Sequence, residues 1–189
     1  MKYCSQCATP VEEIIPEGDN RLRHVCPSCG TIHYQNPNIV AGTLPVYEGK
    51  VLLCKRAIEP RKSYWTLPAG FMENNETTEE GALRETWEEA QAKVNLGQFY
   101  SMITVPAISQ VHIFFLATMD KPEFASGPES EEVALFSEED IPWKEIAFGT
   151  VKMTLRKYFE DRKTQAEHYP TYVDNIIIDL SKYKQEDKS

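Results

Sequence analysis

Three glutamates spaced one helical turn apart are the side chains of this sequence best suited to bind a metal ion. Glu85, Glu88 and Glu89 occupy positions i, i+3 and i+4, so an α-helix would carry all of them on one face. Like charges at this spacing weaken a helix by roughly 0.2–0.5 kcal/mol per pair, which suggests that a cation offsets the repulsion. Carboxylate oxygens suit Mg²⁺ or Mn²⁺, and the neighbouring Arg84 offers a guanidinium fork that can hold a carboxylate in place. The alternative is a solvated acidic helix face, which is the usual meaning of a run of charge.

The residues before these glutamates predict a strand, a tight turn and the start of the helix. Tyr64–Leu67 is a short apolar stretch, and Pro68-Ala69-Gly70 follows it as a turn. Thr77, followed three residues later by Glu80, has the spacing of a capping box, so the helix is expected to begin there. The turn would then place backbone carbonyls beside the acidic face of the helix.

Four cysteines near the N-terminus have the spacing of a zinc site. Cys4 and Cys7 form one pair, Cys26 and Cys29 form the other, and 18 residues separate the pairs. Four cysteine ligands leave no open position on Zn²⁺, so the ion would be structural and would supply folding free energy to a module too small to fold alone. Two redox pairs or unliganded thiols are the alternative.

Length, composition and charge restrict the function classes. A chain of 189 residues allows one or two domains with a sizeable core. The formal net charge of −9 argues against a general nucleic-acid-binding protein, which usually has a basic surface, so we expect no nucleic-acid partner. The N-terminus has no apolar signal segment and no run of 18 apolar residues occurs, so we expect no membrane partner and a cytoplasmic location.

Strands are expected on both sides of the acidic helix, with a second helix near the end. Ile39–Tyr47 and Val51–Cys54 predict a hairpin around Glu48-Gly49, and Gln110–Met119 is expected at the centre of the sheet. Thr150–Arg162 has the apolar spacing of an amphipathic helix. Other predicted elements are strands within 94–105, 133–136 and 175–180 and a helical turn at 137–140. This order predicts an α/β fold, an α/β/α sandwich around a mixed sheet. We divide the chain into a zinc ribbon at 1–35, an α/β domain at 36–165 and a C-terminal extension at 166–189.

Other polar residues have both a structural and a functional interpretation. Arg56 ends a strand, either as surface charge or as a substrate-binding phosphate contact. The lone His112 lies in an apolar strand and is more often a satisfied core histidine than a catalyst. Cys54 is expected to be a small buried apolar residue.

The acidic loop at 120–132 offers candidates for a general base or an extra metal ligand. Glu129, Glu131 and Glu132 could reach the glutamate cluster from this loop, and Glu132 is the residue we favour. A solvated acidic loop is the alternative.

The segment from Gly70 to Ala92 resembles the 23-residue signature of the Nudix hydrolases. The matching residues, all in register, are Gly70, Glu76, Arg84, Glu85, Glu88 and Glu89. Thr86 and Ala92 stand where the family has aliphatic residues, and Gln91 stands in place of its last glycine. Since glycine there supplies a left-handed cap, Gln91 is expected to alter how the helix ends. The resemblance implies the same sandwich fold that the order of elements predicts.

The resemblance also implies a reaction, the hydrolysis of a nucleoside diphosphate linked to another group by in-line attack of water. The implied ligands of the catalytic Mg²⁺ or Mn²⁺ are the carbonyl of Ala69 and the side chains of Glu85, Glu88 and Glu89. Glu76 and Arg84 would hold the helix and the loop in register, and Glu73 would approach the site. A homodimer is expected by resemblance.

A four-cysteine ribbon ahead of a Nudix domain resembles two groups of enzymes. The NADH pyrophosphatases have a further proline-rich array after the signature, which residues 101–110 do not contain. The plant chloroplast FAD and ADP-ribose pyrophosphatases and their bacterial relatives resemble nearly the whole chain, including 34–37, 65–70 and 127–130. FAD or ADP-ribose, cleaved to AMP and a second monophosphate, is therefore favoured as the small-molecule substrate.

Several alternatives to this substrate stay open. Aromatic residues that could stack on adenine or flavin, although each equally suits a core, are Tyr64, Trp65 and Phe71. NADH hydrolysis is one alternative, and a zinc-ribbon protein that senses a nucleotide without cleaving it is another. RNA decapping would require a basic groove that the net charge of −9 does not indicate.

Overall fold

The computed structural model of the chain describes residues 1–177 and divides into two compact units, with the boundary between Pro37 and Asn38. This boundary lies two residues beyond the end of the ribbon that we delimited from the sequence. The first unit holds an antiparallel sheet of β1 (Glu12–Ile14), β2 (Arg23–Val25) and β3 (Ile32–His33). One cysteine-bearing turn precedes β1 and the other connects β2 to β3. Each is closed by a backbone hydrogen bond of 2.9 Å, from Ala8 N–H to Cys4 O and from Gly30 N–H to Cys26 O.

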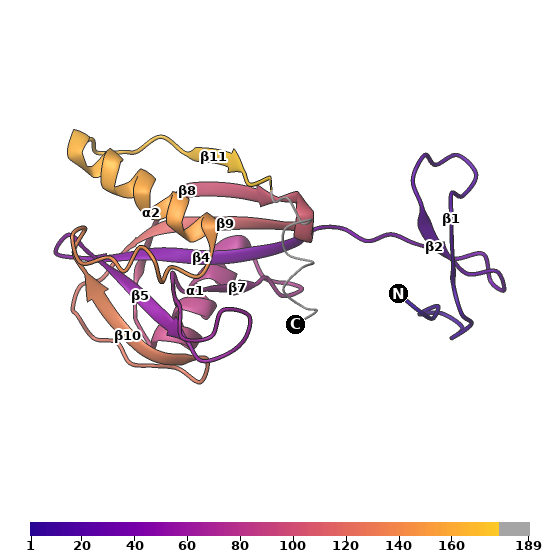
Figure 1. The fold of residues 1–189 in the computed structure, drawn as a ribbon, viewed down its shortest axis with the longest axis horizontal. Helices are drawn as coiled ribbons and strands as arrows, with labels where there is room; N and C mark the ends of the chain where they lie inside the picture. The colour runs from indigo at the N-terminus through magenta and orange to yellow at the C-terminus, as the bar shows by residue number, and fades with distance from the viewer. Residues whose placement is uncertain (178–189) are drawn as a thin grey trace. The chain divides into compact units, whose positions relative to one another are not determined.

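The second unit is built on a mixed sheet (Figure 1). Its main strands, in spatial order, are β10 (Ser130–Phe136), β5 (Lys50–Arg56), β4 (Asn38–Tyr47), β9 (Gln110–Thr118), β8 (Asn95–Val105) and β11 (Tyr172–Asn175). The pairs β4–β9 and β8–β11 are parallel, and the other neighbours are antiparallel. The predicted central position of the 110–119 strand is therefore confirmed, since β9 is hydrogen-bonded on both sides.

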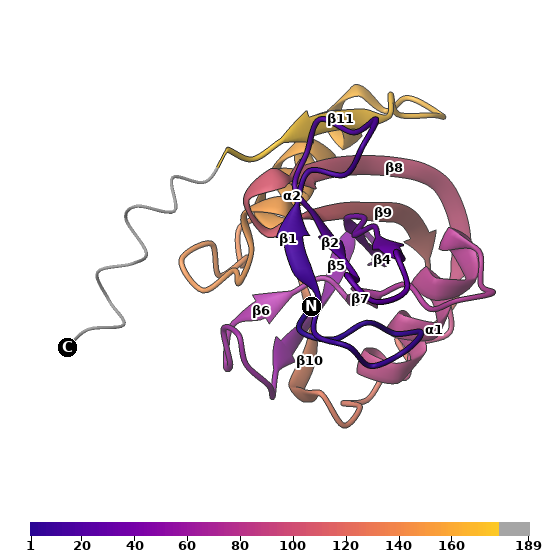
Figure 2. The same ribbon diagram turned by 90° about the vertical axis from the view of Figure 1, so that its right-hand side faces the viewer.

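Helices α1 (Thr78–Ala90) and α2 (Gly149–Asp161) cover opposite faces of this sheet (Figure 2). Consecutive side chains of β4 contact the two helices in turn. The Thr43 hydroxyl lies 2.6 Å from that of Thr86 on α1, whereas Leu44 belongs to the core cluster that includes Leu155 of α2. The predicted α/β/α sandwich is thus confirmed. Two 3₁₀ turns, η1 (Pro106–Ile108) and η2 (Arg162–Thr164), complete the helical elements of the described residues.

Strands β4 and β5 pair with each other only beside their hairpin turn, at Val46–Val51 and Tyr47–Lys50. Away from the turn, β5 pairs with β6 (Trp65–Thr66) and β4 pairs with β7 (Ala69–Phe71). The short connection between β6 and β7 therefore lies between the two long strands. This arrangement carries the glycine-containing turn into the middle of the sheet and next to α1.

The ends of the elements correct three predictions. Gln91 adopts the left-handed conformation itself, with φ 47° and ψ 28°, and its N–H bonds to the carbonyl of Trp87, so the expected change at this helix end is wrong. Residues 137–140 form a turn without a helix. The last strand is β11 at Tyr172–Asn175, earlier than the predicted run at 175–180, of which residues 178–180 lie outside the described part of the chain.

Among the described residues, none of the helices has the length and the apolar character needed to cross a membrane.

Candidate active site and candidate zinc site

Arg84 connects the acidic face of α1 to the loop before it. Its Nε and Nη2 atoms donate to the two carboxylate oxygens of Glu76 at 3.0 and 2.8 Å, and Nη1 donates to Glu85 at 2.7 Å and to Glu88 at 2.9 Å. Nη2 also donates to the carbonyl of Phe71 at 3.1 Å. The hydrogen bonds from Arg84, followed by the N–H of Glu73, lower the pKa of Glu76 to about 2. Loop, turn and helix are thus held by one guanidinium group.

The start of α1 is fixed by the predicted capping box. Thr77 Oγ1 accepts from the N–H of Glu80 at 3.1 Å, and the Glu80 carboxylate accepts from the N–H of Thr77 at 2.8 Å. Since the helix begins here, the side chains one turn apart project toward the sheet in a fixed register.

Ala69 and Gly70, at the start of β7, lie directly against the glutamates. A methyl group at Gly70 would overlap the carboxylate of Glu85 in its present position, so a larger residue here would require that carboxylate to move. The N–H of Ala69 donates to Glu89 Oε2 at 3.2 Å. Glu89 is 6% exposed, and its burial raises the pKa of this carboxyl to about 8. Burial also raises the pKa of Glu85. Buried carboxyls that resist ionisation in this way favour a cation beside them.

The segment 125–130 docks on the C-terminal end of α1. The N–H groups of Ala125 and Gly127 donate to the carbonyls of Ala90 and Glu89 at 2.9 and 3.0 Å, which satisfies two carbonyls that a helix end leaves without partners. A methyl group at Gly127 would collide with the helix backbone at Glu88, so glycine is needed here. The docked segment places Glu129 at the site.

The three candidate glutamates of this loop separate in the structure. Glu129 lines the cavity described below, whereas Glu131 accepts a hydrogen bond from Ser63 Oγ at 3.0 Å. Glu132, which we favoured, is exposed on β10 opposite Lys55 and is not among the lining residues. A β-bulge between Ser130 and Glu132 shifts the register, which could not be read from the sequence. Of the three candidates, only Glu129 lines the cavity, whereas the favoured Glu132 does not.

A cavity of about 890 Å³ opens beside the acidic face of α1. Its size is that of a typical small-molecule site. Its charged lining residues include Arg56, Glu73, Arg84, Glu85, Glu88, Glu89 and Glu129. Its apolar lining residues, here called the apolar wall, include Val40, Ile58, Ile108, Phe114, Phe148 and Val151.

The structure sorts the predicted substrate-binding residues. Phe71 lines the cavity with 52% of its surface exposed, so its ring is available to a ligand. Trp65 is 6% exposed within the main core and does not line the cavity, and neither does Tyr64. Arg56 lines the cavity. Its Nε donates to the carbonyl of Pro60 at 2.9 Å, and its guanidinium carbon lies 5.1 Å from the centroid of the Phe148 ring.

His112 is both a satisfied core histidine and a lining residue of the cavity. Its Nδ1 lies 2.9 Å from the hydroxyl of Thr150, and its Nε2 lies 2.8 Å from Oε1 of Gln110. Sequence reasoning did not select Gln110, although its spacing of two from His112 in a strand places both on one face. Phe148 was also missed, and no sequence signal marks it, because it belongs to an irregular segment before α2.

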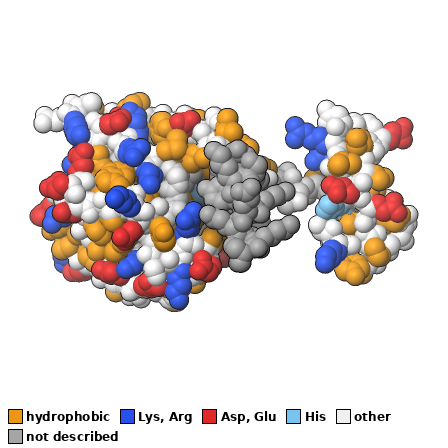
Figure 3. All heavy atoms as spheres, in the orientation of Figure 1, with side chains coloured by type: hydrophobic (Ala, Val, Ile, Leu, Met, Phe, Trp, Pro, Cys, Tyr) orange, Lys and Arg blue, Asp and Glu red, His pale blue; other side chains and the backbone are white. Residues whose placement is uncertain are grey.

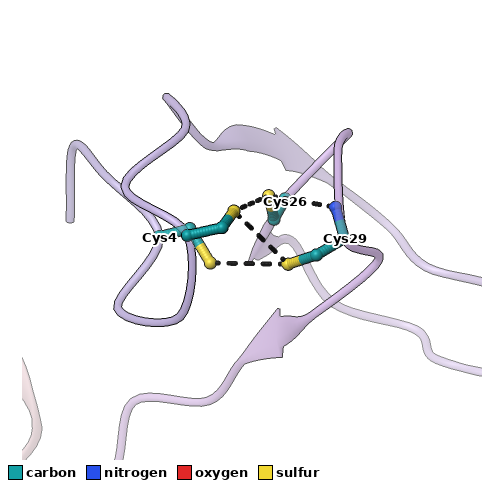
Figure 4. Close-up of side chains that lie close together, drawn as sticks. Cys4, Cys26 and Cys29 are labelled. Carbon is teal, nitrogen blue, oxygen red and sulfur yellow. Dashed lines mark hydrogen bonds between the residues drawn. The ribbon is translucent and has the colours of Figure 1, made fainter.

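The four N-terminal cysteines converge in the first unit, and Figure 4 shows the sulfur atoms of Cys4, Cys26 and Cys29 close together. All four Sγ atoms lie within 4.8 Å of one another, with separations of 3.4 Å for Cys7–Cys26, 3.6 Å for Cys7–Cys29 and 3.7 Å for Cys4–Cys29. A tetrahedron with Zn–S bonds of about 2.3 Å requires sulfurs about 3.8 Å apart, so the cluster fits Zn²⁺. Hydrogen bonds with the side chain and backbone of Thr31 lower the pKa of Cys29 to about 6, which favours the thiolate that binds metal. Cys54, the remaining cysteine, is buried in the other unit, as predicted.

Two family models match the chain. The model described as Nudix N-terminal matches residues 2–35, and the model described as NUDIX domain matches residues 37–157. The first match lies within the first unit, and the second covers most of the second unit.

Individual proteins show the same likeness. A solved Nudix hydrolase from Nitrosomonas europaea is 49% identical with a TM-score of 0.88, over 93% of this chain and 100% of that one. The NAD-capped RNA hydrolase NudC of Chromobacterium violaceum is 32% identical over 145 residues, which are 77% of this chain and 50% of the relative. An ADP-ribose pyrophosphatase from Methanocaldococcus jannaschii is 30% identical over 124 residues, 64% of this chain and 72% of that protein. The chain thus spans about half the length of the NudC relative.

Proposed function

Because this chain belongs to the Nudix family, we propose that it is a metal-dependent pyrophosphohydrolase that cleaves FAD or ADP-ribose and releases AMP. One observation carries the proposal. Three carboxylates of a single helix face, Glu85, Glu88 and Glu89, lie with the glycine turn at one wall of a cavity large enough for a nucleotide. Such a cluster costs helix stability and suits a function that needs concentrated negative charge.

The residues present fit Mg²⁺ or Mn²⁺. The proposed ligands are the carboxylates of Glu85, Glu88 and Glu89 and the carbonyl of Ala69, all oxygen atoms of the kind these ions prefer. When bound, the ions neutralise the pyrophosphate and lower the pKa of water. Glu89 must be ionised to act as a ligand, and the raised pKa that burial gives it makes its ionisation depend on a cation.

Glu129 is the proposed general base. It lies at the cavity on a segment that docks on α1, so its position relative to the glutamates of the helix is fixed by backbone hydrogen bonds. In the proposed reaction its carboxylate takes a proton from water, the water oxygen forms a bond to one phosphorus, and the bridging P–O bond breaks. AMP and a second monophosphate are the products. Arg56, which lines the cavity, is the proposed contact for the leaving phosphate.

The sequence similarity to an ADP-ribose pyrophosphatase supports a dinucleotide or ADP-ribose as substrate. The similarity to NAD-capped RNA hydrolases favours a second candidate, hydrolysis of NADH or of an NAD-capped RNA end. The net charge of −9 weighs against extensive RNA contacts, and on the face containing α2 acidic and basic side chains are interspersed (Figure 3). An RNA substrate held only by its cap nucleotide would not need a basic surface, so it belongs in the test.

The experiment measures AMP released from FAD, ADP-ribose, NADH and an NAD-capped RNA oligonucleotide, each with Mg²⁺. Wild type is compared with Glu89→Gln, and with Glu160→Gln as a matched control, because Glu160 is exposed on α2 and outside the cavity. We expect turnover of FAD or ADP-ribose that falls at least about a hundredfold in Glu89→Gln and is unchanged in Glu160→Gln.

The other outcomes each have a meaning. Turnover of NADH or capped RNA without FAD or ADP-ribose would replace the proposed substrate by the second candidate. Tight binding of a nucleotide that is recovered intact in the presence of metal would support a sensor in place of an enzyme. Equal activity in wild type and Glu89→Gln would contradict the proposed site. Gel filtration of the same samples tests the expected homodimer.

A further inference from the structure

Three polar side chains at the apolar side of the cavity form a hydrogen-bonded series that the proposed reaction does not use. Gln110 and His112 lie on the same face of β9, and Thr150 lies in the first turn of α2. The three are linked by the Gln110–His112 contact of 2.8 Å and the His112–Thr150 contact of 2.9 Å. His112 is 8% exposed and Thr150 is 2% exposed, whereas Gln110 is only half-buried at the cavity.

The order of donors along this series follows from its chemistry. An amide oxygen can only accept, so Nε2 of His112 carries the hydrogen that bonds to Oε1 of Gln110. Burial lowers the pKa of His112 to about 4, so the ring is neutral near pH 7 and has one N–H. Nδ1 must therefore accept, and the Thr150 hydroxyl donates to it.

This order fixes which end of the Gln110 amide faces the ligand. With Oε1 bound to His112, the NH₂ group is the end left for the cavity. Within the described part of the chain, this NH₂ group makes no hydrogen bond to protein. Gln110 lines the cavity together with apolar side chains that include Val40, Ile108, Phe114, Phe148 and Val151. A single NH₂ donor group among apolar side chains can orient a flat, largely apolar ligand through one acceptor atom on that ligand.

We propose that Gln110 is a specificity-determining residue whose NH₂ group donates a hydrogen bond to an acceptor on a planar heteroaromatic ring of the substrate. His112 and Thr150 are positioning residues that hold the amide in this orientation. The inference rests on the proposed function only in taking the substrate to be a nucleotide. Adenine and flavin share the required chemistry, a flat ring with acceptor atoms at its edge.

The test measures binding without divalent metal, so that no hydrolysis is required. The probes are AMP, FMN and ribose 5-phosphate, which shares the phosphate of both but has no ring. The variants are Gln110→Met, which removes the donor at similar size, and Gln35→Met, a matched change at an exposed position outside the cavity. Gln110 is half-buried, so the variant is expected to fold, and circular dichroism checks this.

We expect wild type to bind AMP or FMN more tightly than ribose 5-phosphate. Gln110→Met should weaken the ring-bearing ligand about three- to tenfold, the effect of one hydrogen bond, and leave ribose 5-phosphate unchanged. An effect on AMP alone assigns adenine to this wall, and an effect on FMN alone assigns flavin. Equal weakening of all three probes, or no weakening of any, would overturn the inference.

The positioning role has its own measurement. In Thr150→Val the hydroxyl that holds the His112 tautomer is lost at nearly constant shape. Nitrogen NMR of the imidazole should show the Nε2–H tautomer in wild type and a mixture in the variant, together with weaker ring binding. A single unchanged tautomer in Thr150→Val would contradict this role. Ring-selective binding in a protein that hydrolyses none of the substrate panel would contradict the proposed function while leaving this inference intact.

Discussion

Arg84 explains how three carboxylates can share one helix face before any cation binds. It donates to Glu85 and Glu88 on its own helix and to both oxygens of Glu76 in the preceding loop. The positive charge offsets repulsion that would otherwise weaken α1. Glu89 makes no contact with Arg84 among the described residues, and it is the carboxyl with the pKa raised to about 8 by burial. Glu89, the most buried of the three carboxyls, is thus mostly protonated near pH 7 until a cation favours its ionisation.

His112 gives a prediction for the pH dependence of stability. Burial lowers its pKa from 6.5 to about 4 in the folded protein, so between these values the unfolded chain binds more protons. Stability from this residue is fully present above pH 6.5 and is lost as the pH falls toward 4. Between pH 7 and pH 5 the loss amounts to about 2 kcal/mol.

The measurement is urea unfolding of wild type and His112→Gln at pH 7 and pH 5. The variant has no imidazole to protonate, so the decrease in its free energy of unfolding should be smaller than that of wild type by about 2 kcal/mol. Equal decreases in the two proteins would show that His112 is not the group responsible.

At the scale of elements, the site is assembled by the two ends of α1. The capping box fixes the N-terminal end, and the docked segment at 125–130 covers the C-terminal end. The segment satisfies helix carbonyls and delivers Glu129 to the cavity in the same step. Gly127 is the contact point, since a side chain there would collide with helix backbone that cannot move aside.

This arrangement predicts that substitutions at Gly127 and Glu129 have coupled effects on kcat. Gly127→Ala should displace the segment and lower kcat, because Glu129 no longer reaches the attacking water. Glu129→Gln should lower kcat by about 10²- to 10⁴-fold, the range for loss of a general base. If Gly127→Ala acts through Glu129, the double variant should be no slower than the slower single variant. Fully additive effects on log kcat, measured with the substrate found in the hydrolysis panel, would contradict this coupling.

The same elements show what the sequence could predict and what it could not. Thr77, Glu80 and the glutamate spacing are local patterns, and the capping box and the shared face appear as expected. The choice between Glu129 and Glu132 depended on a β-bulge, which is a feature of strand pairing and has no local signal. The prediction for Gln91 was wrong for another reason, because this residue takes the left-handed conformation that glycine would supply.

At the scale of the whole molecule, the sequence features that predicted the fold best were the predicted strands spread along the whole chain. The apolar runs and the hairpin at Glu48-Gly49 predicted most of the sheet, and the Nudix resemblance agreed with them. The apolar wall of the cavity was not predictable, because it combines Ile58, Ile108 and Phe148 from three separate loops and turns. Neighbours of this kind come together only through the packing of α2 against the sheet.

The division into two units predicts that removal of zinc affects only one of them. The first unit has short strands and little apolar core, so its fold should depend on the four cysteine ligands. We expect about one zinc per chain in wild type and in Cys54→Ala, and none in Cys29→Ser. Hydrogen exchange after chelation should show lost protection within residues 1–37 and unchanged protection in the strands and helices from Asn38 onward. Loss of protection in both units would contradict this independence, and retained protection in the first unit would show that the ribbon folds without its metal.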